Sequence, residues 1–398
     1  MAEFLIGRQQ IFDKHLDTFG YEILFRGNDF DLQEAHGATS ATNQIITDTL
    51  LEFGLNKIVG PDKAFINFTS ENIIAKTPLH LPKDRVVIEV LENVTVNARI
   101  IENIQEFSRL GYTIALDDFV FTDDWVPLIK IADIIKLDVL EMDLDECRQL
   151  IERLKPYQVK ILAEKVETYQ EYRTLKRYGC EYFQGFFFSR PKIVQGKRIG
   201  VNQAAALELI CAINTPEVDF DELSEIISRD VGLSYKLLHY INSAFFAVPN
   251  KINSIHHALT CLGMKEVKRW VNILTLASLS EKPHAILQNS LVRGKMCELL
   301  ASEIGADNEY WFLIGMFSNL DALLDIPLTE ALTQLPLPRD VSEAIIDHSG
   351  TAGEALSCAI HYENWDLSKL EFTGLSQKTI GDIYLQSVHW ANQVMGSI

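Results

Sequence analysis

Short apolar segments alternate with amphipathic helical segments through the first half of the chain, whereas the second half shows helical spacing almost throughout. Eight segments of the first half have the length and composition of strands. They lie near residues 4–11, 20–25, 64–68, 86–91, 112–117, 133–138, 159–164 and 182–188. Helical spacing falls between most of them, at 43–53, 96–110, 144–155 and 167–178. This alternation predicts a parallel sheet, either open and doubly wound or closed as a TIM-type barrel, and eight strands favour the closed α/β barrel.

The connections refine this picture. The first two strands are too close in sequence for a helical crossover, so we expect them to pair antiparallel. In the second half, Gly263 is expected to end one helix and Pro327 to end a long one that runs from Phe312 through Leu324. Loop residues near 195–205 separate the two patterns, which predicts a barrel domain at 1–198 and an all-helical bundle at 199–398.

Composition narrows the class of protein. A length of 398 residues suits two domains, and 47% hydrophobic with 23% charged residues is typical of a globular protein. The net charge of −19 argues against a protein that coats long nucleic acid, which needs a positive surface, although a small anionic ligand remains compatible. Six dispersed cysteines, no signal region and no apolar run near ~20 residues predict a cytoplasmic protein without a membrane anchor.

Polar side chains recur near the carboxyl ends of the predicted strands, where a buried strand should be apolar. With the adjacent pair Asp117-Asp118 counted once, the spacings run from 19 to 28 residues, about one strand-helix unit each, so all should meet at one barrel mouth. The members are Asn67, Glu89, Asp117, Asp118, Lys136, Glu164 and Gln184. Any one of them alone also fits a strand-end or capping residue, but burying so many charges without a function would be costly.

The strand at 20–25 adds to this set. Alternation places Glu22, Leu24 and Arg26 on one side of the strand. If that side faces the barrel axis, the site gains a carboxylate ligand and a cation suited to phosphate.

The chemistry of the set is rich in oxygen. Carboxylates and an amide suit a hard divalent cation such as Mg²⁺ or Mn²⁺, and we expect two of them. Such a pair activates water and clamps the oxygens of a displacement at phosphorus, which predicts phosphodiester hydrolysis.

These residues resemble the motifs of the EAL domain, a family of cyclic di-GMP phosphodiesterases. The resemblance covers about residues 4–195 and follows the family's order: Glu22-Ile-Leu24-Phe-Arg26 for E-A-L-x-R, Ile-Asn67, Glu89-Val-Leu-Glu92 for E-x-T-E, Asp117-Asp118-Phe119, Lys136-Leu-Asp138, Ala163-Glu164-Lys165-Val-Glu167-Thr168 for A-E-G-V-E-T, and Gln184-Gly185 through Arg190-Pro191.

The resemblance implies a TIM-like barrel with an irregular first strand and trimmed helices. It assigns metal ligation to Glu22, Asn67, Glu89, Asp117 and Asp118. It implies that Glu164 acts as general base or at the metal site and that Lys136 holds a water or phosphate. Ligand contacts would come from Leu24, Arg26, Gln184, Arg190 and Pro191, and Glu92 would support the loop after Phe119. The implied reaction opens cyclic di-GMP to linear pGpG.

The chain departs from the family pattern at two places. A glycine-rich loop is expected after Asp117-Asp118-Phe119, but this chain has Val120-Phe121-Thr122 there, and Lys165 replaces a glycine beside Glu164. Val and Phe resist backbone angles that glycine permits, so the loop must follow another path. An alternative therefore stays open, in which the barrel is an inactive cyclic di-GMP receptor or a protein scaffold.

The second half resembles the HDOD domain, a helical relative of the metal-dependent HD phosphohydrolases. Residues 223–243 and 255–263 carry the resemblance. An HD enzyme needs an adjacent His-Asp pair, and residues 201–398 contain none; His256-His257 could hold a metal but also fits ordinary helix positions. We expect a non-catalytic module that binds an unknown protein partner, and the sequence is also compatible with a homodimer.

Overall fold

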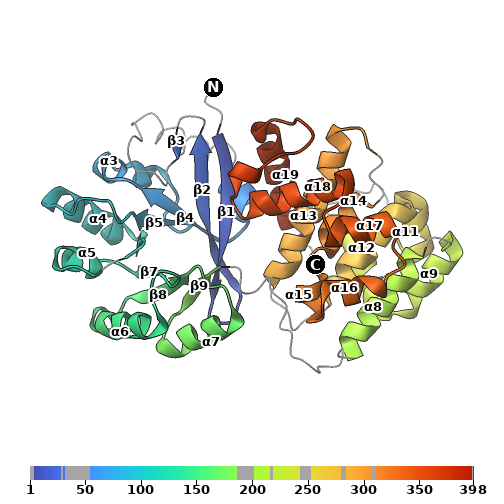
Figure 1. Ribbon diagram of the computed structural model, residues 1–398, viewed down its shortest axis with the longest axis horizontal. Coiled ribbons are helices and arrows are strands. Elements are labelled where there is room, and N and C mark those ends of the chain that lie inside the picture. The colour runs from blue at the N-terminus through green and yellow to red at the C-terminus, as the bar shows by residue number, and fades with distance from the viewer. Residues whose placement is uncertain are drawn as a thin grey trace. The chain divides into compact units, whose positions relative to one another are not determined.

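The computed structural model describes residues 4–27, 30–31, 54–119, 121–185, 201–215, 218–242, 252–278, 284–306, 310–396 and 398. The chain divides into two compact units, residues 1–188 and 189–398 (Figure 1). The predicted helix at 43–53 and the predicted boundary at 198 lie outside the described residues. The limits of 1–198 and 199–398 therefore stay a prediction.

The first unit is a closed barrel, as predicted. Its strands follow one another around the barrel in the order β1, β9, β8, β7, β6, β5, β4 and β2, and β2 also pairs with β1 to close the ring. The strands are β1 (Phe4–Asp13), β2 (Thr18–Gly27), β4 (Lys63–Phe68), β5 (Val86–Val90), β6 (Thr113–Leu116), β7 (Ile134–Asp138), β8 (Lys160–Glu164) and β9 (Tyr182–Gln184), with a short β3 (Phe30–Asp31) beside β2.

Strand direction confirms the irregular start of the barrel. β1 pairs antiparallel with both β2 and β9, whereas the pairs from β2 through β4 to β9 are all parallel. A short link, residues 14–17, joins β1 to β2, and this length suits a hairpin but not a crossover.

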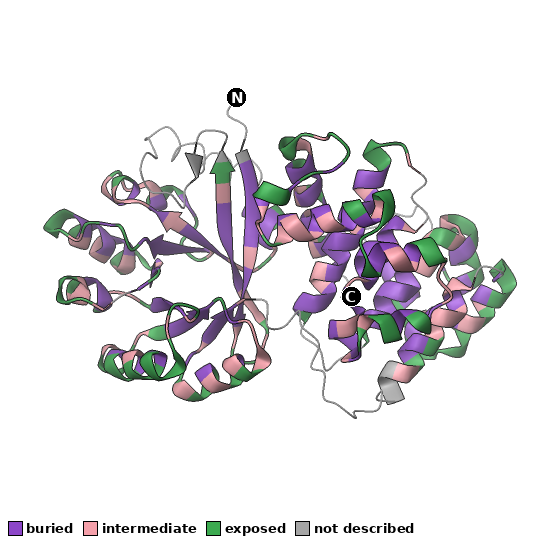
Figure 2. Cartoon of the chain, viewed as in Figure 1, coloured by how far each residue is buried: buried purple, intermediate pink, exposed green. Residues whose placement is uncertain are grey.

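The barrel helices are uneven in length. The longer ones are α4 (Ala98–Leu110), α6 (Leu144–Leu154) and α7 (Tyr169–Tyr178). The shorter ones are α2 (Leu55–Val59), α3 (Ser70–Ile74) and α5 (Val126–Ile129), which matches the expected trimming. Buried residues line the strands, while the long helices present exposed outer faces (Figure 2). The interior is filled by apolar side chains such as Phe65, Val87 and Leu162, so the barrel is a packed core and its functional groups lie at one end.

The second unit is all-helical, as predicted. Its helices are α8 (Val201–Asn214), α9 (Phe220–Arg229), α10 (Val231–Ile241), α11 (Ile255–Leu262), α12 (Met264–Ala277), α13 (His284–Glu303), α14 (Trp311–Phe317), α15 (Leu320–Leu324), α16 (Leu328–Thr333), α17 (Arg339–Ile346), α18 (Gly350–Glu363) and α19 (Gln377–Met395).

Helix α13 is the centre of this unit and packs against α14, α18 and α19. Its crossing with α14 requires glycine: a Cβ atom on Gly315 would lie 2.4 Å from the backbone of Arg293. The polar side of the same crossing holds Arg293, which donates to Asn319 Oδ1 at 2.8 Å and to Glu363 Oε2 at 2.6 Å.

One expectation for this unit is wrong. The long helix predicted to run from Phe312 through Leu324 is broken into α14 and α15 at Ser318 and Asn319. Both side chains bind Arg293 instead of facing solvent, and this polar contact stops the apolar helical pattern. Gly263 does end α11, and Pro327 precedes α16.

Candidate active site at the barrel mouth

The predicted polar residues do converge at the carboxyl ends of the parallel strands. Neighbouring strands place them side by side: Asn67 of β4 is in register with Glu89 of β5, and Asp138 of β7 is in register with Glu164 of β8. Asp117 directly follows β6, and its backbone N–H donates to Val90 O at 3.0 Å. The period of the barrel therefore brings side chains far apart in sequence into one group.

Lys136 lies at the centre of this group. Its ammonium nitrogen contacts four carboxyl groups, at 2.6 Å to Asp117, 2.8 Å to Glu89, 2.9 Å to Glu164 and 3.3 Å to Glu22. The Lys136 side chain is 1% exposed and that of Glu89 is fully buried. Four carboxyl groups thus share a single buried ammonium, which leaves the cluster with an excess of negative charge when all are ionised.

Amide side chains complete the buried part of the site. Gln184 Nε2 donates to Glu22 Oε2 and to Gln9 Oε1, both at 2.8 Å, and Asn67 Nδ2 donates to Glu22 Oε1 at 3.3 Å. Both oxygens of Glu22 are therefore held in place. The next residue must be glycine. A Cβ atom on Gly185 would lie 2.2 Å from Val166 O, in the segment just after β8.

The pKa shifts reflect the crowding of acids. Burial raises the pKa of Glu89 well above its usual value and that of Glu164 to about 8, although Lys136 opposes both shifts. For Glu22, Lys136 and the amide donors outweigh burial and lower the pKa. Burial acts to lower the pKa of Lys136, but the surrounding carboxylates raise it by more. The net pKa lies well above its usual value, so the ammonium stays charged.

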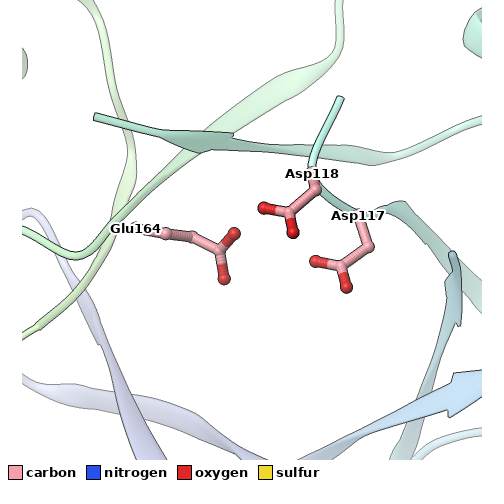
Figure 3. A group of neighbouring side chains, drawn as sticks. All are labelled: Asp117, Asp118 and Glu164. Carbon is pink, nitrogen blue, oxygen red and sulfur yellow. The ribbon is translucent and has the colours of Figure 1, made fainter. Parts of the chain in front are cut away.

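A second group of oxygens opens toward the rim. The carboxylates of Asp117, Asp118 and Glu164 point toward one another, with an oxygen of each lying within 4.8 Å of the others (Figure 3). Asp118 is exposed and has a backbone φ of 38°, a left-handed conformation that Asp tolerates better than most residues. This spacing of hard oxygen donors suits a divalent cation.

Several buried acceptors of the site also lack a hydrogen-bond donor. Within the described residues, Asn67 Oδ1, Gln184 Oε1 and Glu89 Oε2 have no hydrogen-bond partner. Unpaired buried acceptors cost free energy, and a bound cation would compensate them together with the excess carboxylates. The residues present therefore fit a divalent cation.

The remaining sequence-predicted residues lie at or beyond the edge of the described site. Leu24 is buried in β2, Arg26 is exposed near the end of that strand, and Glu92 is exposed after β5. Arg190 and Pro191 lie outside the described residues, as does Val120. In the second unit, His256 and His257 are exposed on α11.

The sequence did not single out two contributors. Gln9 of β1 lies opposite Glu22 in the antiparallel ladder and binds Gln184, which the alternation of β1 against β2 could have indicated. Lys165, known from the sequence only as a departure, forms an ion pair with the buried carboxylate of Asp138. The position of a lysine directly after Glu164 could have indicated that its cation lies at the site.

The exposed loop after Asp118 takes an aromatic path. Phe121 lies beneath the guanidinium of Arg153, with 3.6 Å from Cζ to the ring centroid, and its ring is 6.0 Å from that of Phe119. Phe119 also contacts Trp125 edge to face. Packing of side chains thus holds this loop where a glycine-rich sequence was expected.

Comparison with known proteins identifies both units. The EAL domain matches residues 61–191 and the HDOD domain matches residues 202–345. "Cyclic di-GMP phosphodiesterase CdgJ" of Vibrio cholerae is 34% identical over 372 residues, which cover 92% of this chain and 86% of CdgJ. "Uncharacterized protein YuxH" of Bacillus subtilis is 31% identical over 402 residues, 98% of both chains.

Solved structures with EAL domains are among the matches. The Bacillus subtilis YkuI protein, with an EAL domain and in complex with c-di-GMP and calcium, matches with a TM-score of 0.40 and 16% identity, covering 57% of this chain and 72% of YkuI. No helix in the described part of the chain is both long and apolar enough to cross a membrane. The two domain matches and the two full-length relatives place the chain in the family of proteins that join an EAL domain to an HDOD domain.

Proposed function

We propose that the barrel hydrolyses one phosphodiester bond of cyclic di-GMP and releases linear pGpG. The observation that carries this proposal is the cluster of carboxyl groups around Lys136 at the barrel mouth, with unpaired buried acceptors beside it. CdgJ, a relative across most of the chain, bears the name of a cyclic di-GMP phosphodiesterase. The site and the relationship therefore support the same reaction.

We propose that the divalent cation is Mg²⁺ or Mn²⁺ and that two ions bind. Glu22, Asn67, Glu89, Asp117 and Asp118 would hold the metal, since they supply carboxylate and amide oxygens from β2, β4 and β5 and from the end of the adjacent β6. A bound divalent cation would supply a more acidic water and positive charge beside the phosphate. Glu22 is already fixed by Gln184 and Asn67, so its position needs little adjustment.

Glu164 is suited to accept a proton. Burial raises its pKa to about 8, and its carboxyl lies beside Asp117 and against Lys136. A carboxylate of raised pKa is a stronger base than an exposed one, and the adjacent ammonium stabilises the charged form. Lys136 orders the acids around it and provides positive charge toward a phosphate.

Leu24, Arg26, Gln184, Arg190 and Pro191 form the ligand-contact set that the family resemblance implies. Arg26 supports this assignment because it is exposed on the strand that carries Glu22. Glu92, exposed after β5, is proposed to support the loop that follows Phe119, because it lies near enough to Asp118, at the start of that loop, to add to the rise that burial causes in the pKa of Asp118.

The second candidate is a receptor that binds cyclic di-GMP without hydrolysing it. The aromatic packing of Phe121 favours it, because a loop held by Arg153 and Phe119 has less freedom to rearrange around a reacting phosphate. In either case we propose that the helical unit binds a protein partner and that the protein works in the cytoplasm.

The test is an assay of purified protein with cyclic di-GMP and Mg²⁺ or Mn²⁺, followed by chromatography for pGpG. We expect product with the wild type and a loss of at least about 100-fold in kcat for Glu164→Gln and Asp117→Asn. Glu106→Gln is the matched control, since Glu106, on α4, forms a surface ion pair with Lys76 outside the cluster. Binding without any product would favour the receptor, and full activity in both site variants would remove the proposed site.

A further inference from the structure

Lys165 is a cation that the proposed reaction does not use, although it lies at the rim of the acidic cluster. It directly follows Glu164 and forms an ion pair with the Asp138 carboxylate, which is buried while the lysine side chain is 54% exposed. The other oxygen of Asp138 accepts from the backbone N–H of Leu140 at 2.9 Å. Asp138 is therefore fixed, and it anchors the ammonium.

The backbone around Lys165 is also fixed. Its φ of 54° is left-handed, a conformation that favours glycine over lysine. Hydrogen bonds hold both sides of it: Val139 N–H donates to Glu164 O at 3.3 Å, and Val166 N–H donates to Gln184 O at 3.0 Å. The chain thus carries a lysine where the backbone prefers glycine, and it holds that lysine in one place.

Asp138, which binds the Lys165 ammonium, is in register with Glu164 on the neighbouring strand, so the ammonium lies at the same end of the barrel as the rim carboxylates of Asp117, Asp118 and Glu164. Burial raises the pKa of Asp118, and Lys165 is the strongest of the charges that oppose this shift, ahead of Lys136. Glu164 in turn contributes to the raised pKa of Lys165, after Asp138 and Asp118. The positive charge of Lys165 therefore interacts with two of the three rim carboxylates, Asp118 and Glu164.

We propose that Lys165 is a built-in positive charge that weakens divalent-cation binding at the Asp118 and Glu164 side of the cluster. This inference rests on the proposed metal site but not on turnover of cyclic di-GMP. In a solvated setting, one positive charge several ångströms from a divalent cation changes the binding constant by about tenfold. The protein would hold a cation at the buried oxygens more firmly than one at the rim, and its activity would follow the free cation concentration.

The test is titration of the full-length protein with Mn²⁺ in the absence of nucleotide, with free Mn²⁺ measured by electron paramagnetic resonance. We expect Lys165→Gly to tighten the weakest bound Mn²⁺ about tenfold and Lys165→Arg to leave it unchanged. Raising the salt concentration should shrink the gain, because Lys165 is half exposed. Adding Asp118→Asn to the Lys165→Gly variant should remove the gain.

Lys76→Gly is the matched control. Lys76 has a left-handed φ of 57° and pairs with Glu106 at 2.5 Å, outside the cluster. It should leave Mn²⁺ binding unchanged. Equal Mn²⁺ affinities in the wild type and Lys165→Gly would overturn the inference, as would a gain that survives Asp118→Asn or a protein that binds no Mn²⁺. A protein that binds Mn²⁺ as described but forms no pGpG would contradict only the proposed hydrolysis.

Discussion

The guanidinium of Arg153 lies 3.6 Å above the ring of Phe121. This contact joins α6 to the loop that follows Asp117 and Asp118, and Tyr157 lies near the same ring with 6.5 Å between centroids. A cation on an aromatic face contributes about 0.5–1 kcal/mol at such an exposed position. The loop beside the acidic cluster is therefore held from the outside, by α6, rather than by glycine geometry.

Removing this contact should loosen the loop without unfolding the barrel. We expect Arg153→Ala to lower the free energy of unfolding by about 1 kcal/mol and to speed amide hydrogen exchange in residues 117–125. Arg148→Ala is the matched control, since Arg148 also belongs to α6 but stands 5.9 Å from the ring of Tyr178. Exchange in the loop that is equally fast in both variants would contradict the role of the Arg153 contact.

The sequence predicted most of the barrel and much of the site because both depend on short-range patterns. Eight apolar segments gave the eight strands of the ring, and polar residues at their carboxyl ends gave Glu89, Asp117, Lys136 and Glu164. The number and direction of the strands then determine the convergence of these residues, whatever their separation in sequence.

What the sequence missed depends on contacts between distant side chains. Gln9 is part of the site only because β1 runs antiparallel beside β2, opposite Glu22. The break between α14 and α15 depends on Arg293, which lies in a different helix. Periodicity describes one segment at a time, so neither partner was visible in it.

Lys136 should be essential for stability when no metal is bound. Replacing it by Met leaves four carboxyl groups without their shared ammonium, and breaking such a buried pair costs about 3–5 kcal/mol. We expect Lys136→Met to be destabilised by this amount in EDTA at pH 8, and by less at pH 5, where the acids take up protons. Urea unfolding with and without Mn²⁺ measures both effects, and Mn²⁺ should restore part of the loss.

Lys160→Met provides the comparison for Lys136→Met. Lys160 is exposed at the start of β8, and its ammonium donates to the Tyr182 hydroxyl at 3.1 Å. It should cost less than about 1 kcal/mol. A Lys136 variant as stable as the Lys160 variant at pH 8 in EDTA would show that the carboxyl groups do not depend on the central ammonium.

Glu164 should make the metal-free protein less stable as pH rises. Its folded pKa of about 8 lies above the usual value of 4.5, so between these values the folded protein keeps a proton that the unfolded chain has released. The stability from Glu164 is therefore complete below pH 4.5 and is lost as pH rises toward 8. We expect the wild type in EDTA to lose on the order of 2–4 kcal/mol relative to Glu164→Gln across this window.

Thermal or urea unfolding at several pH values measures this difference. Glu152→Gln is the control, because Glu152 forms an exposed pair with Lys155 and should show the wild-type pH dependence. Added Mn²⁺ should reduce the fall, since a cation favours the ionised carboxylate. Parallel pH profiles for the wild type and Glu164→Gln in EDTA would mean that Glu164 is ionised throughout.

In the helical unit, the buried pair of Arg293 and Glu363 should matter far more than a surface pair of the same chemistry. Arg293 is 8% exposed and donates to Glu363, Ser318 and Asn319, so Glu363→Ala leaves a buried guanidinium with only the two neutral partners. We expect a loss of about 3–5 kcal/mol from this change. Glu343→Ala removes the exposed partner of Arg339 and should cost about 0.5 kcal/mol or less.

A double variant tests the same point from the other side. Adding Arg293→Met to a Glu363→Met variant should recover part of the stability that Glu363→Met loses, because no unpaired charge then remains in the α13–α14 crossing. Urea unfolding of the four variants distinguishes this from a general effect of helix substitutions, which would make the Glu363 and Glu343 variants equally unstable.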